Sequence, residues 1–299
     1  MSLYDEMVAE RAERVGTATP NVEQEVMQRI ALAGLHRGGF FQHAAFYGGT
    51  CLRIFHNLPR FSEDMDFSLV EKRDDIHLED YFPSIIEEFK LAGHEVNIVK
   101  KEKKIFGRVE SAFLKENTEA YDIKAVIKRE QSQTRLDSAE REQARTKSKF
   151  QTKKTVKVKI ELDIDPPLAF ETEQKMLVRP YTFMARCFTL PYLYAGKMHA
   201  LVYRAWQRRI KGRDWYDFEW YVRHQIPLDY QHLQERIREF SGEVVEKEEF
   251  MRLLREKLST SDIELVKQDV TGFIDDPREL DIWSNDYFLQ LADMIIFKE

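Results

Sequence analysis

Two aspartates separated by one residue, Asp64 and Asp66, are the side chains best suited to chemistry in this sequence of 299 residues. They alternate with Met65 and Phe67. Because alternate side chains of a β-strand share a face, both carboxylates should point the same way while the apolar residues enter the core. Paired carboxylates supply the hard oxygen ligands that Mg²⁺, or Mn²⁺ in its place, uses together with nucleotide phosphates. The pair therefore predicts a divalent cation site for phosphate chemistry.

Two consecutive glycines, Gly48 and Gly49, precede this pair in the chain. Without Cβ atoms they let the backbone approach a triphosphate and donate N–H groups to it. Thr50 and the apolar residues after it indicate the start of a helix whose positive end faces the same anion. A Gly-Gly dipeptide alone is usually a turn, and a lone Asp-x-Asp is usually a solvated strand edge. Here both occur within nineteen residues, which favours a nucleotide site.

The clearest strand pattern lies further along, at residues 156–164. Apolar residues alternate there with polar ones, which is the period-two pattern of a strand with one buried face. The polar face carries two lysines followed by three acids: Lys157, Lys159, Glu161, Asp163 and Asp165. Exposed polar alternation would explain this pattern by itself, but the first motif favours a further acid of the same site.

A second group of polar residues lies on two predicted helices of the carboxyl-terminal half. Lys197 and Arg204 are seven residues apart and hence on one helix face. Asp214 and Asp217 are three residues apart at the start of the next helix. Taken singly, Lys197 would be a solvated lysine and Asp214 an N-terminal cap or first-turn acid.

The order of these blocks resembles that of the nucleotidyltransferase superfamily. The first block is similar in particular to that of the AbiEii/AbiGii toxin family, and it comprises Gly48, Gly49, Thr50, Arg60, Ser62, Asp64 and Asp66. The helix with Lys197 and Arg204, and the Lys-x-Arg-Asp-x-x-Asp run that follows it, resemble the closing motifs of that family. The matching blocks span residues 46–221. The chain departs from the family pattern at Cys51, where a plain aliphatic residue is common. It also departs in the second motif, around Glu161, which lacks the usual Asn-Pro ending.

The resemblance implies a metal-dependent enzyme that transfers a nucleoside monophosphate from an NTP to an acceptor and releases pyrophosphate. Its implied metal ligands are Asp64, Asp66 and Glu161. Asp163 stays open as the third carboxylate, although Lys159-Ile-Glu161 resembles the second motif and favours Glu161.

The same resemblance implies that Lys197 contacts the nucleotide and that Asp214 serves catalysis, by orienting Lys197 or by taking a proton. Arg60 and Ser62 are expected chiefly to hold the loop before the carboxylate strand, with phosphate contact as a second role. The predicted catalytic residues are Asp64, Asp66, Glu161, Asp163, Lys197 and Asp214. The predicted nucleotide-binding residues are Gly48, Gly49, Thr50, Arg60, Ser62, Lys197 and Arg204.

The family also implies a toxin that is paired with an antitoxin protein and acts in phage defence or growth control, with RNA such as tRNA as the acceptor. The net charge of −6 argues against a protein that coats nucleic acid over its whole surface. Residues 128–159 nevertheless hold eleven Lys or Arg against four Asp or Glu. Such runs are often solvated surface, but this one leads into the predicted strand of Glu161 and is a candidate phosphate-binding surface.

The composition is that of a soluble globular protein, with 43% hydrophobic and 33% charged residues. No apolar run reaches membrane-spanning length, so we expect no membrane partner and a cytoplasmic location. Cys51 and Cys187 are the only cysteines and belong to no Cys/His cluster, which argues against a zinc site or a disulfide framework. Cys51 is expected to be a small buried residue of a helix.

The predicted fold class is α/β, in the α+β sense: a mixed sheet with flanking helices, followed by a helical domain. Helices are expected at 20–37 and 78–91, and strands at 44–47, 95–100, 108–114, 121–128 and 156–164. Beyond residue 191 the pattern is helical, at 192–211, 214–224, 230–240, 247–258 and a final segment. We therefore divide the chain into residues 1–180 and 181–299, with the site in the groove between them.

Two alternatives stay open. One is a nucleic-acid-binding module on the same fold that has lost turnover, and the intact carboxylates and lysine count against it. The other is a nucleotidyltransferase for a small hydroxylated molecule, which needs the same metal site but no basic surface.

Overall fold

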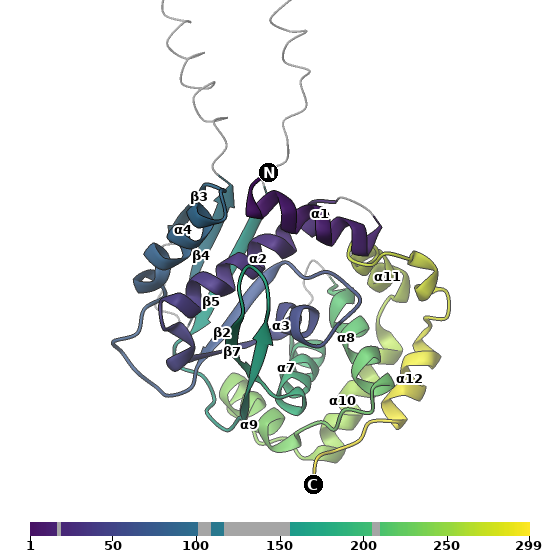
Figure 1. Cartoon of the computed structure of the whole chain (residues 1–299). Helices are drawn as coiled ribbons and strands as arrows, with labels where there is room; N and C mark the ends of the chain where they lie inside the picture. Colours follow the sequence, from purple (N-terminus) through teal and green to yellow (C-terminus); the bar gives the residue numbers. More distant parts are fainter. Residues whose placement is uncertain (17–18, 101–108, 117–155, 205–209) are drawn as a thin grey trace, which may run out of the picture.

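The centre of the protein is a mixed β-sheet with the strand order β3-β4-β5-β2-β1-β7-β6 (Figure 1). This computed structural model describes residues 1–16, 19–100, 109–116, 156–204 and 210–299. Within them the strands are β1 (Ala44–Tyr47), β2 (Asp64–Leu69), β3 (Val96–Lys100), β4 (Val109–Glu116), β5 (Lys157–Asp163), β6 (Thr172–Leu177) and β7 (Phe183–Phe188). The pairs β2–β5 and β1–β7 are parallel, and the other neighbours are antiparallel.

The strand β2 has the two-sided character that its sequence predicts. Met65 and Phe67 are fully buried, while Asp64 and Asp66 are only partly buried. In the parallel pairing, Asp66 lies opposite Glu161 of β5. The two strands therefore present their acidic residues on the same face of the sheet.

One group of helices covers one side of the sheet, and a second group forms the other half of the molecule. The first group is α1 (Leu3–Val15), α2 (Pro20–Arg37), α3 (Gly48–Phe55) and α4 (Phe82–Leu91). Of these, α2 contacts β5, β7 and α4, and α1 packs on α2. Short 3₁₀ turns are η1 (Phe40–Gln42), η2 (Leu78–Tyr81) and η3 (Pro277–Leu280).

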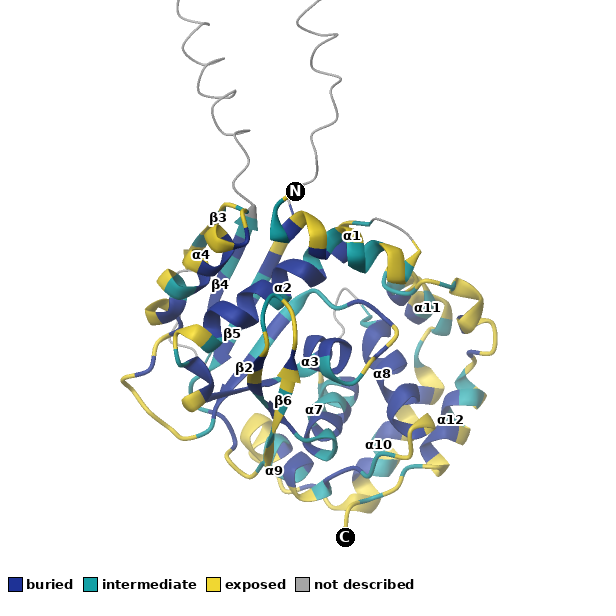
Figure 2. Cartoon of the chain, in the orientation of Figure 1, coloured by how far each residue is buried: buried dark blue, intermediate teal, exposed yellow. Residues whose placement is uncertain are grey.

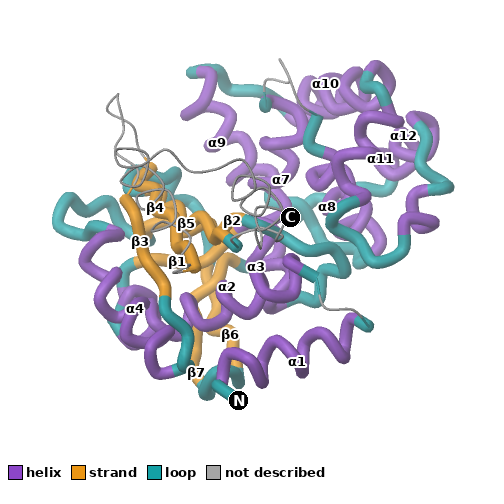
Figure 3. The backbone as a smooth tube through the Cα atoms, turned by 90° about the horizontal axis from the view of Figure 1, so that it is seen from above, coloured by secondary structure: helices purple, strands orange, loops and turns teal. Residues whose placement is uncertain are grey.

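The second group of helices forms the other half of the molecule (Figure 3). Its members are α7 (Leu190–Tyr203), α8 (Gly212–Arg223), α9 (Tyr230–Ser241), α10 (Lys247–Thr260), α11 (Ile263–Thr271) and α12 (Asn285–Asp293). The helix α7 packs against both α8 and α9 and also contacts α3, so it lies between the two halves. None of the described helices is long and apolar enough to cross a membrane.

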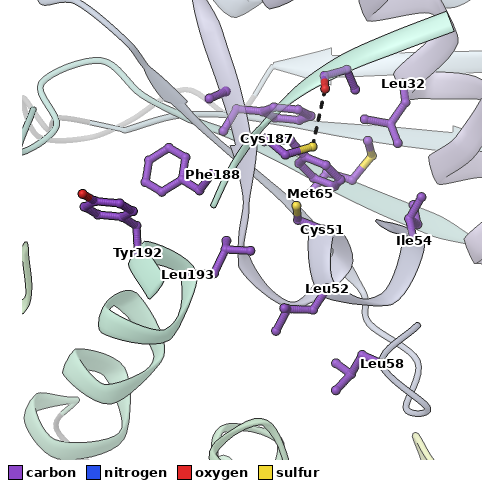
Figure 4. Packing of buried hydrophobic residues seen from close by; sticks show 14 of the residues in the cluster. Leu32, Cys51, Leu52, Ile54, Leu58, Met65, Cys187, Phe188, Tyr192 and Leu193 are labelled. Atoms are coloured by element: carbon purple, nitrogen blue, oxygen red, sulfur yellow. Dashed lines mark hydrogen bonds between the residues drawn. The ribbon is translucent and has the colours of Figure 1, made fainter. Parts of the chain in front are cut away.

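The buried residues form one continuous core (Figure 2). Cys51, in the first turns of α3, lies among apolar side chains that include Leu52, Met65 and Cys187 (Figure 4). Cys51 and Cys187 are both buried and unoxidised. The expectation that Cys51 is a packing residue is confirmed.

The predicted mixed sheet with flanking helices and a following helical half is confirmed, and the sheet includes two strands that were not predicted. Residues 172–188 were not predicted as sheet, yet they form β6 and β7, and β7 pairs with β1. The boundary predicted at residue 180 therefore falls between two strands of the sheet, and the helical half begins with α7. The predicted strand at 121–128 and residues 128–155 of the basic stretch lie outside the described residues.

Candidate active site

Three carboxylates meet on neighbouring strands at the centre of the sheet. Asp64 and Asp66 come from β2, and Glu161 comes from β5, where it pairs in register with Asp66. Glu161 is not free, because Lys159 Nζ lies 2.5 Å from its Oε2 atom and Ser111 Oγ donates a 3.0 Å hydrogen bond to its Oε1 atom. The sheet therefore brings the predicted acids together and places one lysine among them.

The mutual repulsion of these acids affects their protonation. Burial raises the pKa of Asp66 to about 6, and the negative charges of Asp64 and Glu161 contribute to this shift. Burial likewise raises the pKa of Asp64, although Lys159 opposes the shift. Concentrated negative charge of this kind is stabilised when a cation binds.

The glycine turn lies directly against these carboxylates. Gly48 has φ = +80°, and a Cβ atom on it would lie 2.4 Å from Asp66 Oδ2. A Cβ atom on Gly49 would lie 2.8 Å from Arg60 Nη2 and 2.9 Å from Ser62 Oγ. Position 48 thus requires glycine for both its backbone and its close contact, and a side chain at Gly49 would displace Arg60 or Ser62. The turn also begins α3, whose first N–H groups have no partner within the helix.

Thr50 has a different contact from the one expected of a phosphate ligand. Its side chain is fully buried, and its hydroxyl group donates a hydrogen bond to the backbone oxygen of Asp64. The side chain of Thr50 therefore fixes α3 to β2, and only its backbone N–H remains suited to an anion.

The helical half supplies the cationic side chains. Lys197 Nζ of α7 lies 2.7 Å from Asp217 Oδ2 and 3.3 Å from Asp214 Oδ1. Arg204 Nη1 lies 3.0 Å from Asp214 Oδ2. Asp214 therefore orients both Lys197 and Arg204, which agrees with one of its two predicted roles.

Asp217 is a central residue that was not among the predicted site residues. Besides Lys197, it accepts two 2.6 Å hydrogen bonds from Arg60, through Nε and Nη2. Burial alone would raise the pKa of Asp217, but the charges of Arg60 and Lys197 lower it below its ordinary value. Asp217 is thus a charged link between the loop before β2 and the helix that carries Lys197.

Arg60 is almost completely buried and is occupied by these contacts. Its Nη1 atom donates to the backbone oxygen of Phe61, in addition to the bonds with Asp217. This geometry favours the first of its two predicted roles, holding the loop, over direct contact with phosphate.

Most of these groups line one cavity of about 160 Å³ between the sheet and the helical half. Its lining comprises Gly49, Arg60, Ser62, Asp64, Asp66, Lys159, Glu161, Lys197, Arg204, Lys211, Arg213 and Asp214. We call it the carboxylate cavity. Lys211 and Arg213 belong to the Lys-x-Arg-Asp-x-x-Asp run but were not predicted as site residues. Burial lowers the pKa of Lys211, and the positive charge of Arg204 adds to this effect.

Asp163 lies apart from this cavity. It pairs in register with Ser68, beyond Asp66, and it lines a neighbouring cavity together with Asp165 and Arg236. Of the two candidates for the third carboxylate, the geometry therefore places Glu161, and not Asp163, beside Asp66.

The predicted metal site is only partly formed by the side chains as they lie here. Among the described residues, no group of three or more His, Cys, Asp or Glu side chains is arranged to hold a metal ion. Two carboxylates on one strand, with phosphates as the other ligands, nevertheless fit the donor set that Mg²⁺ favours. Glu161 can join them only if Lys159 releases it.

The dense aromatic residues of the second half are part of the core. Trp215, Tyr216, Phe218 and Trp220 are all buried. Trp206 lies outside the described residues. The four described rings serve packing.

Comparison with known proteins gives one strong match. A family model for the nucleotidyl transferase AbiEii toxin of type IV toxin–antitoxin systems matches residues 30–294, which include every predicted site residue. The fold also resembles the crystal structure of JHP933 from Helicobacter pylori, with a TM-score of 0.46 and 16% identity over 92% of this chain and 89% of that one. A second H. pylori structure, provisionally described as a nucleotidyltransferase, gives a TM-score of 0.45 and 17% identity, covering 91% and 92%. No curated protein matches the sequence.

Proposed function

The chain belongs to the AbiEii family of nucleotidyl transferase toxins, and on that premise we propose that it transfers a nucleoside monophosphate from an NTP to an RNA acceptor such as tRNA. The observation that supports this most is the carboxylate cavity. It brings together Asp64 and Asp66, the glycine turn, and Lys197 from the other half of the chain. A triphosphate needs all three kinds of group.

The triphosphate would lie along the cationic side of the cavity. The N–H groups of Gly48, Gly49 and Thr50 at the start of α3 would donate to its β and γ phosphates. Lys197 and Arg204 would offset the negative charge that develops on the leaving pyrophosphate. Ser62 and the buried Arg60 hold the loop that completes this side.

Asp64 and Asp66 would hold Mg²⁺, or Mn²⁺, and Glu161 would complete the set of ligands once Lys159 has turned to a phosphate. The cation would supply charge neutralisation at the reacting phosphate. The raised pKa of Asp66 supports this assignment, because burial and the charges of Asp64 and Glu161 outweigh the attraction of Lys197 and Lys159 in the protein alone.

The reaction itself needs few further groups. The acceptor hydroxyl oxygen forms a bond to the α phosphorus, the bond from that phosphorus to the pyrophosphate oxygen breaks, and the hydroxyl proton passes to a carboxylate of the site. Glu161 is the acid we assign to that proton, since it lies beside Asp66 on the neighbouring strand. Asp214 keeps Lys197 and Arg204 in position.

The choice of RNA rests on charge and on the family. Residues 128–159 hold eleven basic side chains and precede Glu161 directly in the sequence, which makes them a candidate surface for the phosphates of an RNA. As the toxin of a toxin–antitoxin pair, the protein would act in the cytoplasm, in phage defence or growth control, and would be opposed by a cognate antitoxin.

The test is a transfer assay with each labelled NTP, Mg²⁺ and total cellular RNA. We expect label in RNA with the wild-type protein and none with Asp64→Asn/Asp66→Asn. Asp293→Asn, at an exposed position of α12, serves as the control and should label RNA normally. Equal labelling by the double variant would refute the assignment of the carboxylates.

The acceptor is tested separately. Neutralising Arg141, Arg145, Lys147 and Lys149 should abolish labelling of RNA if RNA is the acceptor. Undiminished labelling of a small hydroxylated molecule by the same variant would indicate the small-molecule alternative.

A further inference from the structure

A second cavity, of about 300 Å³, adjoins the carboxylate cavity between α7 and α9. The two cavities share Asp66, Lys197 and Arg204 in their linings. A volume of this order is typical of small-molecule sites. A ligand with its charged part among the carboxylates and lysines would therefore reach directly into the second cavity.

The wall of the second cavity differs in character from that of the first. Four aromatic rings line it, and we call it the aromatic cavity: Tyr47 from β1, His199 and Tyr203 from α7, and Phe240 from α9. The rings of His199 and Tyr203 stack at 5.3 Å between centroids, with 15° between their planes. Phe240 stands edge-on to His199 at 5.3 Å and is 64% exposed, so it forms the rim.

Polar atoms in the same wall lack partners. Tyr203 Oη, His199 Nε2 and Arg236 Nε are buried and have no hydrogen-bond partner among the described residues. Arg236 also lines this cavity. Buried polar atoms are nearly always paired in native proteins, so three unpaired ones on side chains that line one cavity favour a polar ligand that these side chains turn to meet.

The protonation of His199 suits such a ligand. Burial lowers the pKa of His199 to about 4, and the charges of Arg236 and Arg204 add to this effect. The ring is therefore neutral near pH 7, and one of its nitrogens can accept a hydrogen bond while the other donates one.

From these observations we propose that the aromatic cavity binds the base of the NTP, which packs against Phe240 and the His199 ring and accepts a hydrogen bond from Arg236. This inference rests on the proposed function, because that function places the triphosphate in the adjoining cavity. A planar base with polar edges matches aromatic walls that carry unpaired polar atoms. The sugar would then lie near Asp66 and Lys197, where the two cavities meet.

A base of the acceptor RNA is the alternative ligand of this cavity, because it has the same planar ring and polar edges. The NTP is favoured because one sugar joins its base to its phosphates, and the aromatic cavity adjoins the predicted phosphate site directly. Trp215, Tyr216, Phe218 and Trp220 of α8 are buried in the core, so they do not compete for this role.

The test measures binding of the four NTPs and of inorganic tripolyphosphate to the full chain by titration calorimetry with Mg²⁺. The variants are Phe240→Ala and Arg236→Gln. Leu265→Ala, at a 49% exposed position of α11, and Arg238→Gln, at an exposed position of α9, are the matched controls. Thermal unfolding checks that each variant is folded.

We expect Phe240→Ala to weaken binding of the preferred NTP by about five- to a hundredfold, the range for loss of one stacking partner. Arg236→Gln should weaken it and also change the ranking of the four NTPs. Tripolyphosphate, which has no base, should bind all variants within about twofold of the wild type, and the controls should match the wild type throughout.

Other results would overturn the proposal in distinct ways. If both variants bind NTPs as the controls do, the base lies elsewhere while the proposed function stands. If only the KM for RNA rises in the transfer assay, the cavity holds a base of the acceptor. If the wild type binds neither NTP nor tripolyphosphate, the nucleotide site itself is refuted.

Discussion

Arg60 and Asp217 form a bidentate ion pair in which both side chains are almost fully excluded from solvent, at 1% and 0% exposure. Arg60 precedes the carboxylate strand β2, and Asp217 lies on α8. Because Asp217 also contacts Lys197, this pair couples the loop before the acids to the cation that faces them. The geometry of the candidate site therefore depends on a link outside the predicted site.

Loss of that link should destabilise the protein strongly. Asp217→Asn leaves the Arg60 charge buried without its partner, and we expect the free energy of unfolding to fall by about 3–5 kcal/mol. Urea unfolding measures this. Arg252→Gln, which removes an exposed pair with Glu249, should change it by less than about 1 kcal/mol.

A double variant separates the effect of the pair on the stability of the protein from its effect on the position of Lys197. Arg60→Met/Asp217→Leu replaces both charges with apolar groups and should recover much of the lost stability. NTP binding should stay weak, because Lys197 loses its nearest partner. Recovery of both properties would show that the pair has only a structural role.

The two candidates for the third carboxylate can be told apart by substitution. Glu161→Gln should lower the rate of transfer by more than about a hundredfold, as loss of a group at the reacting phosphate would. Asp163→Asn, two residues along the same strand, should keep most of the rate. Single-turnover kinetics with saturating NTP measures both, and the reverse ranking would assign the role to Asp163.

Gly48→Ala should damage the site through two effects. The alanine must adopt φ = +80°, and its Cβ atom would lie 2.4 Å from Asp66 Oδ2. Gly242→Ala is the matched control, because Gly242 has φ = +78° and open space around it. Both should lose about 1–2 kcal/mol of stability from the backbone alone, but only Gly48→Ala should also lose NTP binding. Equal binding by the two variants would contradict the close approach.

The pH dependence of stability tests the environment of Asp66. Its pKa is raised from 3.8 to about 6, so the folded metal-free protein retains a proton between these pH values that the unfolded chain releases. The contribution of Asp66 to stability therefore falls as pH rises from about 4 to 6 and stays low above that. Asp66→Asn carries no charge and escapes this loss.

We accordingly expect Asp66→Asn to stabilise the metal-free protein by about 1–2 kcal/mol at pH 8 and by little at pH 4. Thermal unfolding in chelator at the two pH values measures the difference. If Asp66→Asn stabilised the protein equally at pH 4 and pH 8, the charge of Asp66 would not be the cause of the stabilisation.

Much of the fold and site follows from local sequence patterns. The helix after Thr19-Pro20, the strand Ala44–Tyr47 and the alternating strand β5 were predicted within one or two residues of their observed bounds. The period-two rule placed Asp64 and Asp66 on one face of their strand, and Glu161 on the polar face of another. These signals are local, because each depends on side-chain spacing along one element.

The rest depends on contacts that no local pattern encodes. Arg60 and Asp217 are 157 residues apart, and only the packing of α8 against the loop pairs them. The strand β6 lies at the sheet edge and has few apolar residues, so its sequence does not resemble a strand. The helix α1, by contrast, carries a local signal, because Ser2 and Asp5 form a capping box at its start.

The residues on the two sides of the joined cavities differ in how easily they can be substituted. A Cβ atom on Gly49 would lie 2.8 Å from Arg60, which is itself held by Asp217, whereas Phe240 on α9 is 64% exposed. A substitution at the glycine turn must therefore displace other groups of the site, while a substitution of Phe240 displaces none. We expect that the choice of nucleotide can be altered from α9 without disturbing the carboxylates.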